Sequence, residues 1–450
     1  MVVQKFGGTS VADADAIRRL IEIVRGASLR DGRGPVVVVS AMSGVTDALL
    51  AIAASAGRGE LEKALVHVAE LRDRHLRAAG ELVPGGGEVV GELTRQFDEL
   101  EAIVRALAVL REVSPRTLDV VAAMGEHLSS WIVAAALGAA GVRSRWIDAR
   151  RAIVTSDDHT QAVPFMNETN AALAASVVPA VDAGCVPVLG GFVGATRDGH
   201  TTTLGRGGSD YSGALVGAGT GAREIQIWTD VDGMLTADPR VVTSPRLVPA
   251  LSFAEAAELA YFGAKVLHPS TILPAVERNI PVRILNSHRP SGPGTTITAD
   301  PALNGTPIAA LASKRGVTVI DVTSSRMLMA YGFLRQVFEV FERFRTAVDV
   351  VTTSEVSVSV TVDDRRQIEP ITDALKALGE VAVEPDMALL CAVGDRLRDE
   401  PEIGARVVAI LEEVPLRMIS QAASRRNITV VLRQGDLPHA MQRLHEELFG

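Results

Sequence analysis

The four consecutive valines Val36–Val39 constrain the fold more than any other part of this sequence. A segment with no polar side to turn toward water predicts a strand that is buried on both faces, as in the parallel sheets of α/β proteins. The segment runs directly into residues 41–46, where most side chains are small. Ligands of open α/β sheets bind at the carboxyl ends of the strands, so this loop is a candidate binding loop.

Strands and helices alternate over roughly the first 290 residues. Extended segments are expected at 2–6, 36–39, 144–147, 186–189 and 225–229, with helical segments at 14–25 and onward to residue 112. This alternation predicts a three-layer α/β/α domain. Proline and glycine cluster in residues 286–307, as is typical of turns and linkers, so the first domain is placed at residues 1–298.

The C-terminal third changes to shorter units that repeat. A strand at 317–322, a helix at 333–344, strands at 348–352 and 356–362, a helix at 368–378 and a strand at 381–383 give the ferredoxin-like order βαββαβ. A second round begins at residue 388 and lacks its closing strand, which a spare strand at 308–312 would supply. The sequence therefore predicts two small domains, at 315–386 and 387–450, the second completed by residues 307–314.

Bulk composition argues against several classes of protein. The chain has 450 residues, enough for two to four domains of roughly 100–200 residues each. Its net charge is −9 with basic residues scattered among acidic ones, so no nucleic-acid partner is expected. No apolar run reaches the roughly 20 residues that span a bilayer, and a strand begins at residue 2, so neither a membrane span nor a targeting peptide is expected. Cys185 and Cys391 stand alone, which favours buried thiols in a reducing, cytoplasmic compartment.

Two glycine clusters each lie beside a fixed cation: Lys5-Phe6-Gly7-Gly8-Thr9-Ser10 and Gly205-Arg206-Gly207-Gly208-Ser209-Asp210. Glycine lets the backbone approach a phosphate closely and turn its N–H groups toward it, while the cation neutralises charge. Neither cluster is a Walker A loop or a dinucleotide-binding G-x-G-x-x-G. Either cluster alone is equally consistent with an ordinary turn. The two clusters together, with the motifs that follow, indicate a phosphate site.

Three further motifs extend the pattern along the chain: Trp228-Thr229-Asp230-Val231-Asp232-Gly233, Thr236-Ala237-Asp238-Pro239-Arg240 and Phe262-Gly263-Ala264-Lys265-Val266-Leu267-His268-Pro269. With the glycine clusters they resemble the aspartate kinases (aspartokinases), and in particular the monofunctional lysine-sensitive bacterial form. This resemblance implies an amino-acid kinase catalytic domain followed by two ferredoxin-like ACT domains, through which the chain would form a homodimer. It also implies an enzyme that transfers the γ-phosphoryl of ATP to the β-carboxylate of L-aspartate, giving 4-phospho-L-aspartate, in the first step of lysine, methionine and threonine biosynthesis.

The chemistry of this reaction explains the residue types in the motifs. A carboxylate with a pKa near 4 is already ionised at neutral pH, so the reaction needs no general base. The site must instead position the two substrates and neutralise charge during an in-line transfer. Cations and amide-rich glycine turns meet that need without a nucleophile–base pair.

The resemblance also implies roles for single residues. Lys5 lies at the transferred phosphoryl, Arg206 clamps a carboxylate of aspartate with its planar guanidinium, and Glu126 binds the substrate ammonium. Catalytic roles fall to Lys5, Arg206 and Asp210. The amino-acid pocket contains Thr46, Glu126, Phe192, Arg206, Ser209 and Asp210.

ATP is implied as the co-substrate, with Mg²⁺ bridging its β- and γ-phosphates instead of sitting in a cage of protein side chains. The backbone N–H groups of Gly7 and Gly8 are expected to hold the phosphates. Leu235 stands where relatives have an aromatic residue beside the base. None of the 9 histidines has a metal-ligand spacing, so no metal site is expected from them. The nucleotide site is expected to contain Lys5, Gly7, Gly8, Ser10, Thr229, Asp230, Asp232, Leu235, Arg240, Lys265 and Val266.

The first ACT domain resembles the effector site of lysine-inhibited aspartate kinases. Asp349 and Glu355 would bind the two amino groups of L-lysine, and Gly332 allows a tight turn that would hold its carboxylate. Ala330 and Ala347 stand where polar residues are expected in lysine-binding relatives, which leaves a threonine-regulated enzyme as an alternative. The expected effector residues are Met327, Ala330, Gly332, Phe333, Leu334, Val348, Asp349, Ser354 and Glu355.

Two other functions remain open at this point. Another member of the amino-acid kinase family would phosphorylate glutamate, carbamate or a nucleotide, but the K-F-G-G-T-S opening and the paired ACT domains favour aspartate. A catalytically inactive amino-acid sensor would not need Lys5, Arg206, Asp210 and Lys265, and the chain retains all four.

Overall fold

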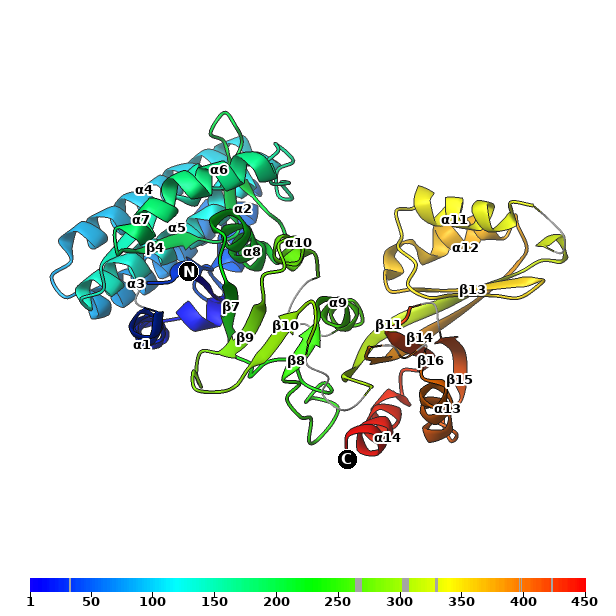
Figure 1. Ribbon diagram of the computed structural model, residues 1–450. Helices are drawn as coiled ribbons and strands as arrows, with labels where there is room; N and C mark the ends of the chain where they lie inside the picture. Colours follow the sequence, from blue (N-terminus) through cyan, green and yellow to red (C-terminus); the bar gives the residue numbers. More distant parts are fainter. Residues whose placement is uncertain are drawn as a thin grey trace. The chain divides into compact units, whose positions relative to one another are not determined.

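The computed structural model describes residues 1–31, 34–263, 269–301, 307–327, 331–395, 397, 399–421 and 424–450. The chain divides into two compact units, one of Met1–Met234 and Leu267–Pro301 and one of Leu235–Val266 and Ala302–Gly450 (Figure 1). The sequence placed Leu235–Val266 inside the catalytic domain, and here the structure differs. The reason is apolar packing, because Ala237 and Val242 belong to a hydrophobic core of the second unit.

The first unit is built on a mainly parallel sheet. Neighbouring strands pair in parallel, except that β9 and β10 are antiparallel. All four valines of β2 are fully buried, as predicted from the sequence. The strands lie in the order β3 (Ser144–Ile147), β4 (Val186–Gly190), β2 (Val36–Val39), β1 (Val2–Phe6), β7 (Glu224–Thr229), β9 (Val282–Asn286) and β10 (Thr295–Thr298).

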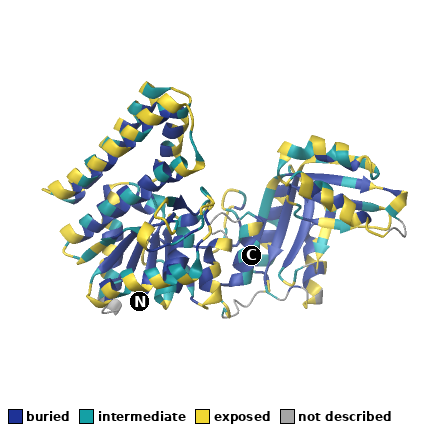
Figure 2. Cartoon of the chain, turned by 90° about the horizontal axis from the view of Figure 1, so that it is seen from above, coloured by how far each residue is buried: buried dark blue, intermediate teal, exposed yellow. Residues whose placement is uncertain are grey.

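Helices pack around this sheet, and its strands are buried while the outer faces of the helices are exposed (Figure 2). A small hairpin of β5 (Val193–Ala195) and β6 (Thr201–Thr203) lies outside the main sheet. The helices are α1 (Ala14–Asp31), α2 (Val45–Gly57), α3 (Leu61–Leu82), α4 (Gly87–Leu110), α5 (Pro115–Ala139), α6 (Met166–Ser176), α7 (Val178–Asp182), α8 (Gly208–Thr220) and α10 (Leu273–Glu277).

Helix α5 is the central helix of this unit. It begins at a clear signal, because Pro115 is its first residue and the Ser114 hydroxyl accepts a hydrogen bond from the Thr117 N–H. By length and composition it is apolar enough to cross a membrane, which the sequence had not predicted for any segment. However, 78% of its most apolar window is buried inside the fold, as expected of a core helix.

The second unit is built on one antiparallel sheet. Strands β11 and β14 each have 14 residues and pair along their length, where the sequence predicted separate short strands. The pairing register shifts next to Gly316, whose φ of 76° favours glycine, and this irregularity separates the two halves of β11. The sheet order is β12 (Val351–Thr353), β13 (Ser357–Val362), β11 (Ala310–Thr323), β14 (Glu380–Val393), β16 (Asn427–Arg433) and β15 (Leu416–Gln421).

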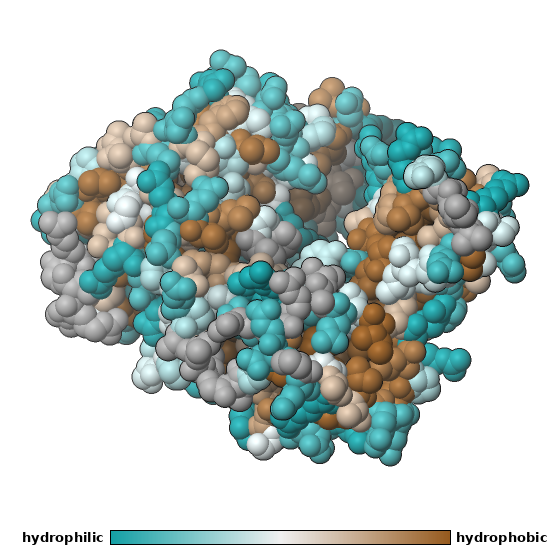
Figure 3. Space-filling view, turned by 45° about the vertical axis from the view of Figure 1, so that its right-hand side comes forward, coloured by the Kyte–Doolittle hydropathy of each residue, from teal (hydrophilic) through white to brown (hydrophobic). Residues whose placement is uncertain are grey.

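Two hydrophobic cores divide this sheet between two modules. One core contains residues of α11 (Phe333–Arg343) and α12 (Ile368–Leu375), and the other contains residues of α13 (Pro401–Ile410) and α14 (Leu437–Phe449). The unit also holds β8 (Ala250–Ser252) and α9 (Phe253–Tyr261). The space-filling view shows hydrophobic surface among the hydrophilic side chains (Figure 3), and the exposed apolar residues of this unit include Leu334, Phe338, Val351 and Ile419.

Candidate active site

A cavity of about 900 Å³ lies at the carboxyl ends of the central strands in the first unit. Its walls come from the loops that follow β1, β2, β4 and β7, from the start of α8 and from one face of α5. The loop at residues 41–46, expected to bind a ligand, contributes to this wall. The cavity thus occupies the edge of the sheet where ligands of α/β proteins bind.

Lys5 and Asp210 form a nearly buried ion pair next to the cavity, although neither is among the residues that line it. The Lys5 Nζ lies 2.6 Å from the Asp210 Oδ1, and the two side chains are 7% and 17% exposed. Helix α8 comes this close to β1 because Gly213 has no side chain, and a Cβ there would lie 3.1 Å from the Lys5 Cβ. The ammonium is therefore held in one place at the end of β1.

Glu126 is a buried carboxyl on the cavity side of α5, and only 3% of the residue is exposed. Burial raises its pKa to about 8, against the opposing effects of hydrogen bonds from backbone N–H groups and the charge of Lys5. Its Oε2 has no hydrogen-bond partner among the described residues. A buried carboxyl oxygen without a partner is suited to an ammonium group of a ligand.

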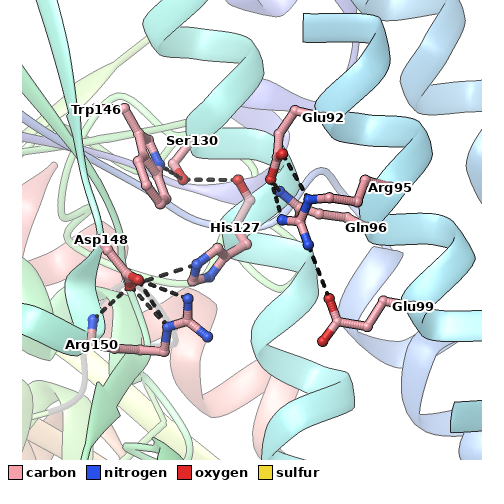
Figure 4. Close-up of polar contacts among 9 residues, drawn as sticks. All are labelled: Glu92, Arg95, Gln96, Glu99, His127, Ser130, Trp146, Asp148 and Arg150. Carbon is pink, nitrogen blue, oxygen red and sulfur yellow. Dashed lines mark hydrogen bonds and ion pairs between the residues drawn. The ribbon is translucent and has the colours of Figure 1, made fainter. Parts of the chain in front are cut away.

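His127 and Ser130 of α5 belong to a polar cluster with side chains of neighbouring segments (Figure 4). The His127 Nε2 lies 3.6 Å from Asp148, and its ring packs edge-on against Trp146. The Trp146 Nε1–H donates to the Ser130 hydroxyl, which donates to the His127 carbonyl. Burial lowers the pKa of His127 to about 4, so the ring is neutral and acts as a packing group. Glu126, the neighbour of His127 on α5, faces the cavity.

The second glycine cluster supplies the opposite wall. Gly205 and Gly207 both have a φ of 74°, and the loop between them presents Arg206 to solvent. The exposed Arg206 lines the cavity, and no hydrogen bond or ion pair of its guanidinium to another described residue is seen, which leaves it available for a carboxylate. Gly208 is required because a Cβ there would lie 2.6 Å from the Phe192 ring. The Ser209 hydroxyl bonds to the Ser40 hydroxyl at 2.9 Å, which joins the cluster to the end of β2.

Asp119 is a residue of this site that the sequence reasoning missed. It is fully buried and lines the cavity, and its carboxylate accepts hydrogen bonds from the His159 Nδ1 at 2.6 Å, the Thr160 N–H at 3.0 Å and the Thr203 hydroxyl at 2.5 Å. Thr160 has a φ of 72°, which is strained for this residue type. Asp119 precedes Glu126 by two helical turns, so their shared helix face was a signal available in the sequence.

In the first glycine cluster, two residues predicted to bind the nucleotide already have partners within the chain. The Gly7 N–H donates to the Trp228 carbonyl at 2.9 Å, so it is not free to bind a phosphate. Ser10 is 1% exposed and its hydroxyl bonds to Ser287 at 2.8 Å and to the Trp228 carbonyl, so it does not line the cavity. Gly7 and Gly8 both line it, and a Cβ on Gly8 would lie 3.1 Å from the Ala41 carbonyl.

The remaining nucleotide residues are only partly assembled. Thr229 and Asp230 line the cavity, whereas Asp232 is engaged by Arg289 at 2.6 Å and by the Asn286 side chain at 2.8 Å. Among the described residues no group of three potential metal ligands comes together. Of the other predicted members, Leu235 and Arg240 belong to the second unit, where Arg240 pairs with Asp238, and Lys265 and Val266 lie outside the described residues.

The predicted effector residues lie in the second unit around the start of α11 and next to β12. Gly332 precedes α11 with a φ of 83°, and a nearby cavity of about 180 Å³ is lined by Phe333 but by neither Asp349 nor Glu355. Glu355 is exposed, whereas the Asp349 side chain is 4% exposed and already paired with Lys314. The Asp349 N–H donates to the Thr361 carbonyl, and the Ser354 hydroxyl is hydrogen-bonded to the Ser357 hydroxyl. Met327, Leu334 and Val348 flank the same region. Ala330 lies outside the described residues.

Comparison with known proteins identifies the family. The amino acid kinase family model matches residues 1–286, and an ACT domain model matches residues 390–448. The chain is 36% identical over 460 residues to lysine-sensitive aspartokinase 3 of Escherichia coli, covering 100% of this chain and 99% of that protein. The chain belongs to the aspartokinase family. It is also 36% identical to chloroplastic aspartokinase 3 of Arabidopsis thaliana, covering 99% of this chain and 81% of that one.

Solved aspartokinase structures agree with this assignment. Escherichia coli aspartokinase III in complex with aspartate and ADP (R-state) matches over 100% of both chains with a TM-score of 0.84 and 36% identity. The same aspartokinase in complex with lysine and aspartate (T-state) matches with a TM-score of 0.83. The aspartokinase fold, with an amino-acid kinase domain and ACT domains, is therefore the fold of this chain.

Proposed function

We propose that the cavity of the first unit transfers the γ-phosphoryl of ATP to the β-carboxylate of L-aspartate, giving 4-phospho-L-aspartate. The observation that carries this proposal is the arrangement of charge around one cavity. The Arg206 guanidinium and the buried Glu126 carboxyl line the cavity, and the Lys5 ammonium lies beside it behind Gly7. These three groups are the complements of a carboxylate, an ammonium and a phosphoryl group. An amino acid with a second carboxylate, beside a nucleotide, fits this set.

The residues divide between the two substrates. Glu126 pairs with the α-ammonium of aspartate, and Arg206 binds one of its carboxylates through two parallel hydrogen bonds. Lys5 neutralises charge on the transferred phosphoryl, and Asp210 holds the Lys5 ammonium in position. Thr46, Phe192 and Ser209 shape the amino-acid pocket, since all three line the cavity. Thr46 comes after β2, and Ser209 lies in the first turn of α8.

ATP is the co-substrate, together with Mg²⁺. Gly8, Thr229 and Asp230 line the cavity near Lys5 and are assigned to the phosphate side. Bound together with ATP, Mg²⁺ would neutralise charge on the phosphates. Lys265 and Val266 are assigned to the nucleotide on their sequence motif.

A coupled assay of ADP release tests this function. L-aspartate should give rapid ADP release, while L-glutamate, carbamate and nucleoside monophosphates should give little. Trapping of the acyl phosphate by hydroxylamine should yield the hydroxamate of aspartate. A preference for another acceptor would show that the enzyme has a different activity within the amino-acid kinase family. No ADP release with any acceptor would favour an amino-acid sensor.

Regulation by L-lysine through the first ACT domain is the second part of the proposal. A related aspartokinase has been solved with lysine and aspartate, and in this chain Asp349 and Glu355 offer carboxylates for the two amino groups. The exposed apolar side chains on α11 and on the edge strands β12 and β15 support a homodimer formed through the ACT domains. The two unpaired cysteines support a reducing, cytoplasmic location.

Glu355→Ala should abolish inhibition by lysine, because the exposed Glu355 carboxylate is assigned to one of its ammonium groups. The measurement is the lysine concentration for half-inhibition, expressed relative to the uninhibited rate of each variant. Threonine and methionine are tested in parallel. If the wild type responds to threonine alone, threonine and not lysine is the effector. If lysine inhibits Glu355→Ala as it inhibits the wild type, Glu355 is not part of the site.

A further inference from the structure

Asp349, which we assign to the effector, already binds an ammonium that belongs to the chain itself. The Lys314 Nζ lies 3.1 Å from its Oδ1 and 3.0 Å from its Oδ2. The Tyr261 hydroxyl donates to the same Oδ1 at 2.8 Å. Both carboxylate oxygens are therefore in use, and the Asp349 side chain is only 4% exposed. An effector ammonium cannot reach Asp349 without changing these contacts.

Lys314 has a second acidic partner besides Asp349. Its Nζ also lies 2.6 Å from the Asp363 Oδ2, and it lies 5.4 Å from the centre of the Tyr261 ring. The ammonium thus sits among two carboxylates and an aromatic face, which is a complete binding site for an alkylammonium ion. If an external ammonium takes Asp349, Lys314 remains paired with Asp363, which is 42% exposed. Its charge is never left without a partner, so the exchange does not require burial of an unpaired ion.

Tyr261 connects this site to the nucleotide motif along the chain. It is the last residue of α9 and directly precedes the motif at residues 262–269, which contains Lys265. One turn before Tyr261 on the same helix, Glu258 accepts hydrogen bonds from Ser424 and Asn427, both at 2.7 Å. Helix α9 is therefore tied to the first ACT module through Asp349 and to the second through Glu258.

We propose that Lys314 is an internal competitor of the effector ammonium at Asp349, and that displacement of Lys314 weakens the Tyr261–Asp349 contact that anchors α9. This inference rests on the proposed regulation of the enzyme by lysine and adds its mechanism. An effector ammonium bound to Asp349 would compete with the Tyr261 hydroxyl for the same carboxylate. Effector binding and the anchoring of α9 are therefore linked. The site selects a primary ammonium, since that is the group it already holds.

Removal of the competitor gives the sharpest test. Lys314→Met should make the enzyme more sensitive to L-lysine, with half-inhibition at a concentration about tenfold lower, because Asp349 then has no internal ammonium. Lys314→Gln should shift sensitivity in the same direction and guards against a packing effect of the methionine. Lys376→Met is the matched control, because Lys376 forms an exposed pair with Asp373 at 2.8 Å and should leave sensitivity unchanged. Unchanged or reduced sensitivity in both folded Lys314 variants would overturn the competition.

Tyr261→Phe tests the link to α9 separately. It removes one hydroxyl, so L-lysine should still bind with a dissociation constant within about twofold of wild type by calorimetry, but the maximal inhibition should fall. Full inhibition of this variant at saturating lysine would overturn the link. The outcomes separate the two proposals: a wild type that neither binds nor responds to lysine fails the proposed regulation and this mechanism together. A lysine-inhibited wild type whose Lys314 variants are not sensitised fails only the competition.

Discussion

At the scale of single residues, the cavity holds its charges in place before substrates bind. Lys5 is paired with Asp210, and Glu126 is buried on α5. Rigid, prepositioned charge is what an in-line phosphoryl transfer needs, because the carboxylate nucleophile of aspartate requires no base. Each of these side chains therefore has a separable kinetic effect.

Replacing Lys5 by alanine should reduce kcat by at least about a hundredfold, equivalent to roughly 3 kcal/mol, since its charge acts on the transferred phosphoryl. The KM for aspartate should stay within a few-fold of wild type. Lys63→Ala is the control, because Lys63 forms only an exposed pair with Glu60 and should leave kcat unchanged. Retention of more than half of the wild-type kcat would exclude the assignment of Lys5.

The raised pKa of Glu126 predicts how the KM for aspartate depends on pH. Only the ionised carboxylate pairs with the substrate ammonium, and with a pKa of about 8 its ionised fraction falls as the pH drops below that value. The KM for aspartate should therefore rise by up to about tenfold per pH unit as the pH is lowered from 8 toward 6, at saturating ATP. Glu126→Gln should give a higher KM that no longer changes with pH. A pH-independent KM in the wild type would contradict this role.

At the scale of elements, the sequence predicted those parts of the fold that depend on local patterns. The four valines of β2 indicate a parallel sheet, because a strand buried on both faces must be apolar throughout. The glycine clusters indicate its loops, because a close approach of the backbone requires glycine. The long strands β11 and β14 were not predicted, since their halves are joined only by pairing with each other. The hydrogen bonds of Ser10 were not predicted, because its partners, Trp228 and Ser287, come from distant segments.

Asp119 is the clearest case of a site residue whose role depends on distant partners. It joins α5 to the loop at 159–160 and to β6, which together form the wall beside Arg206. Asp119→Asn should lower the free energy of unfolding by about 1–3 kcal/mol, because an amide cannot accept all of these hydrogen bonds. The KM for aspartate should rise roughly tenfold with a smaller effect on the KM for ATP. Urea unfolding and steady-state kinetics would measure both, with the exposed Asp373→Asn as control.

A rise in the KM for ATP equal to that for aspartate would mean that Asp119 supports the whole cavity and not the aspartate wall in particular. An unchanged KM for both, with lowered stability, would leave it a purely structural residue.

At the scale of the whole molecule, the segment Leu235–Val266 is shared between two functions. It falls within the region matched by the amino acid kinase family model, yet its side chains complete the ACT unit. The Thr236 carbonyl accepts from the Leu311 N–H at 2.7 Å, and the Thr236 hydroxyl bonds to the His445 ring at 2.8 Å. A boundary drawn from sequence at residue 298 cannot reveal this, because both partners are remote in the chain.

This sharing predicts that the catalytic region cannot be released from regulation by simple truncation. A fragment of residues 1–301 would expose Ala237 and Val242, which pack against Ile308, Leu311 and the helix α14 in the full chain. It would also leave Glu258 without Ser424 and Asn427. The fragment should therefore have less than about a tenth of the full-length kcat and a lower melting temperature, instead of a fully active enzyme that ignores lysine. A monomeric, stable fragment with full activity would show that Leu235–Val266 folds without the ACT unit.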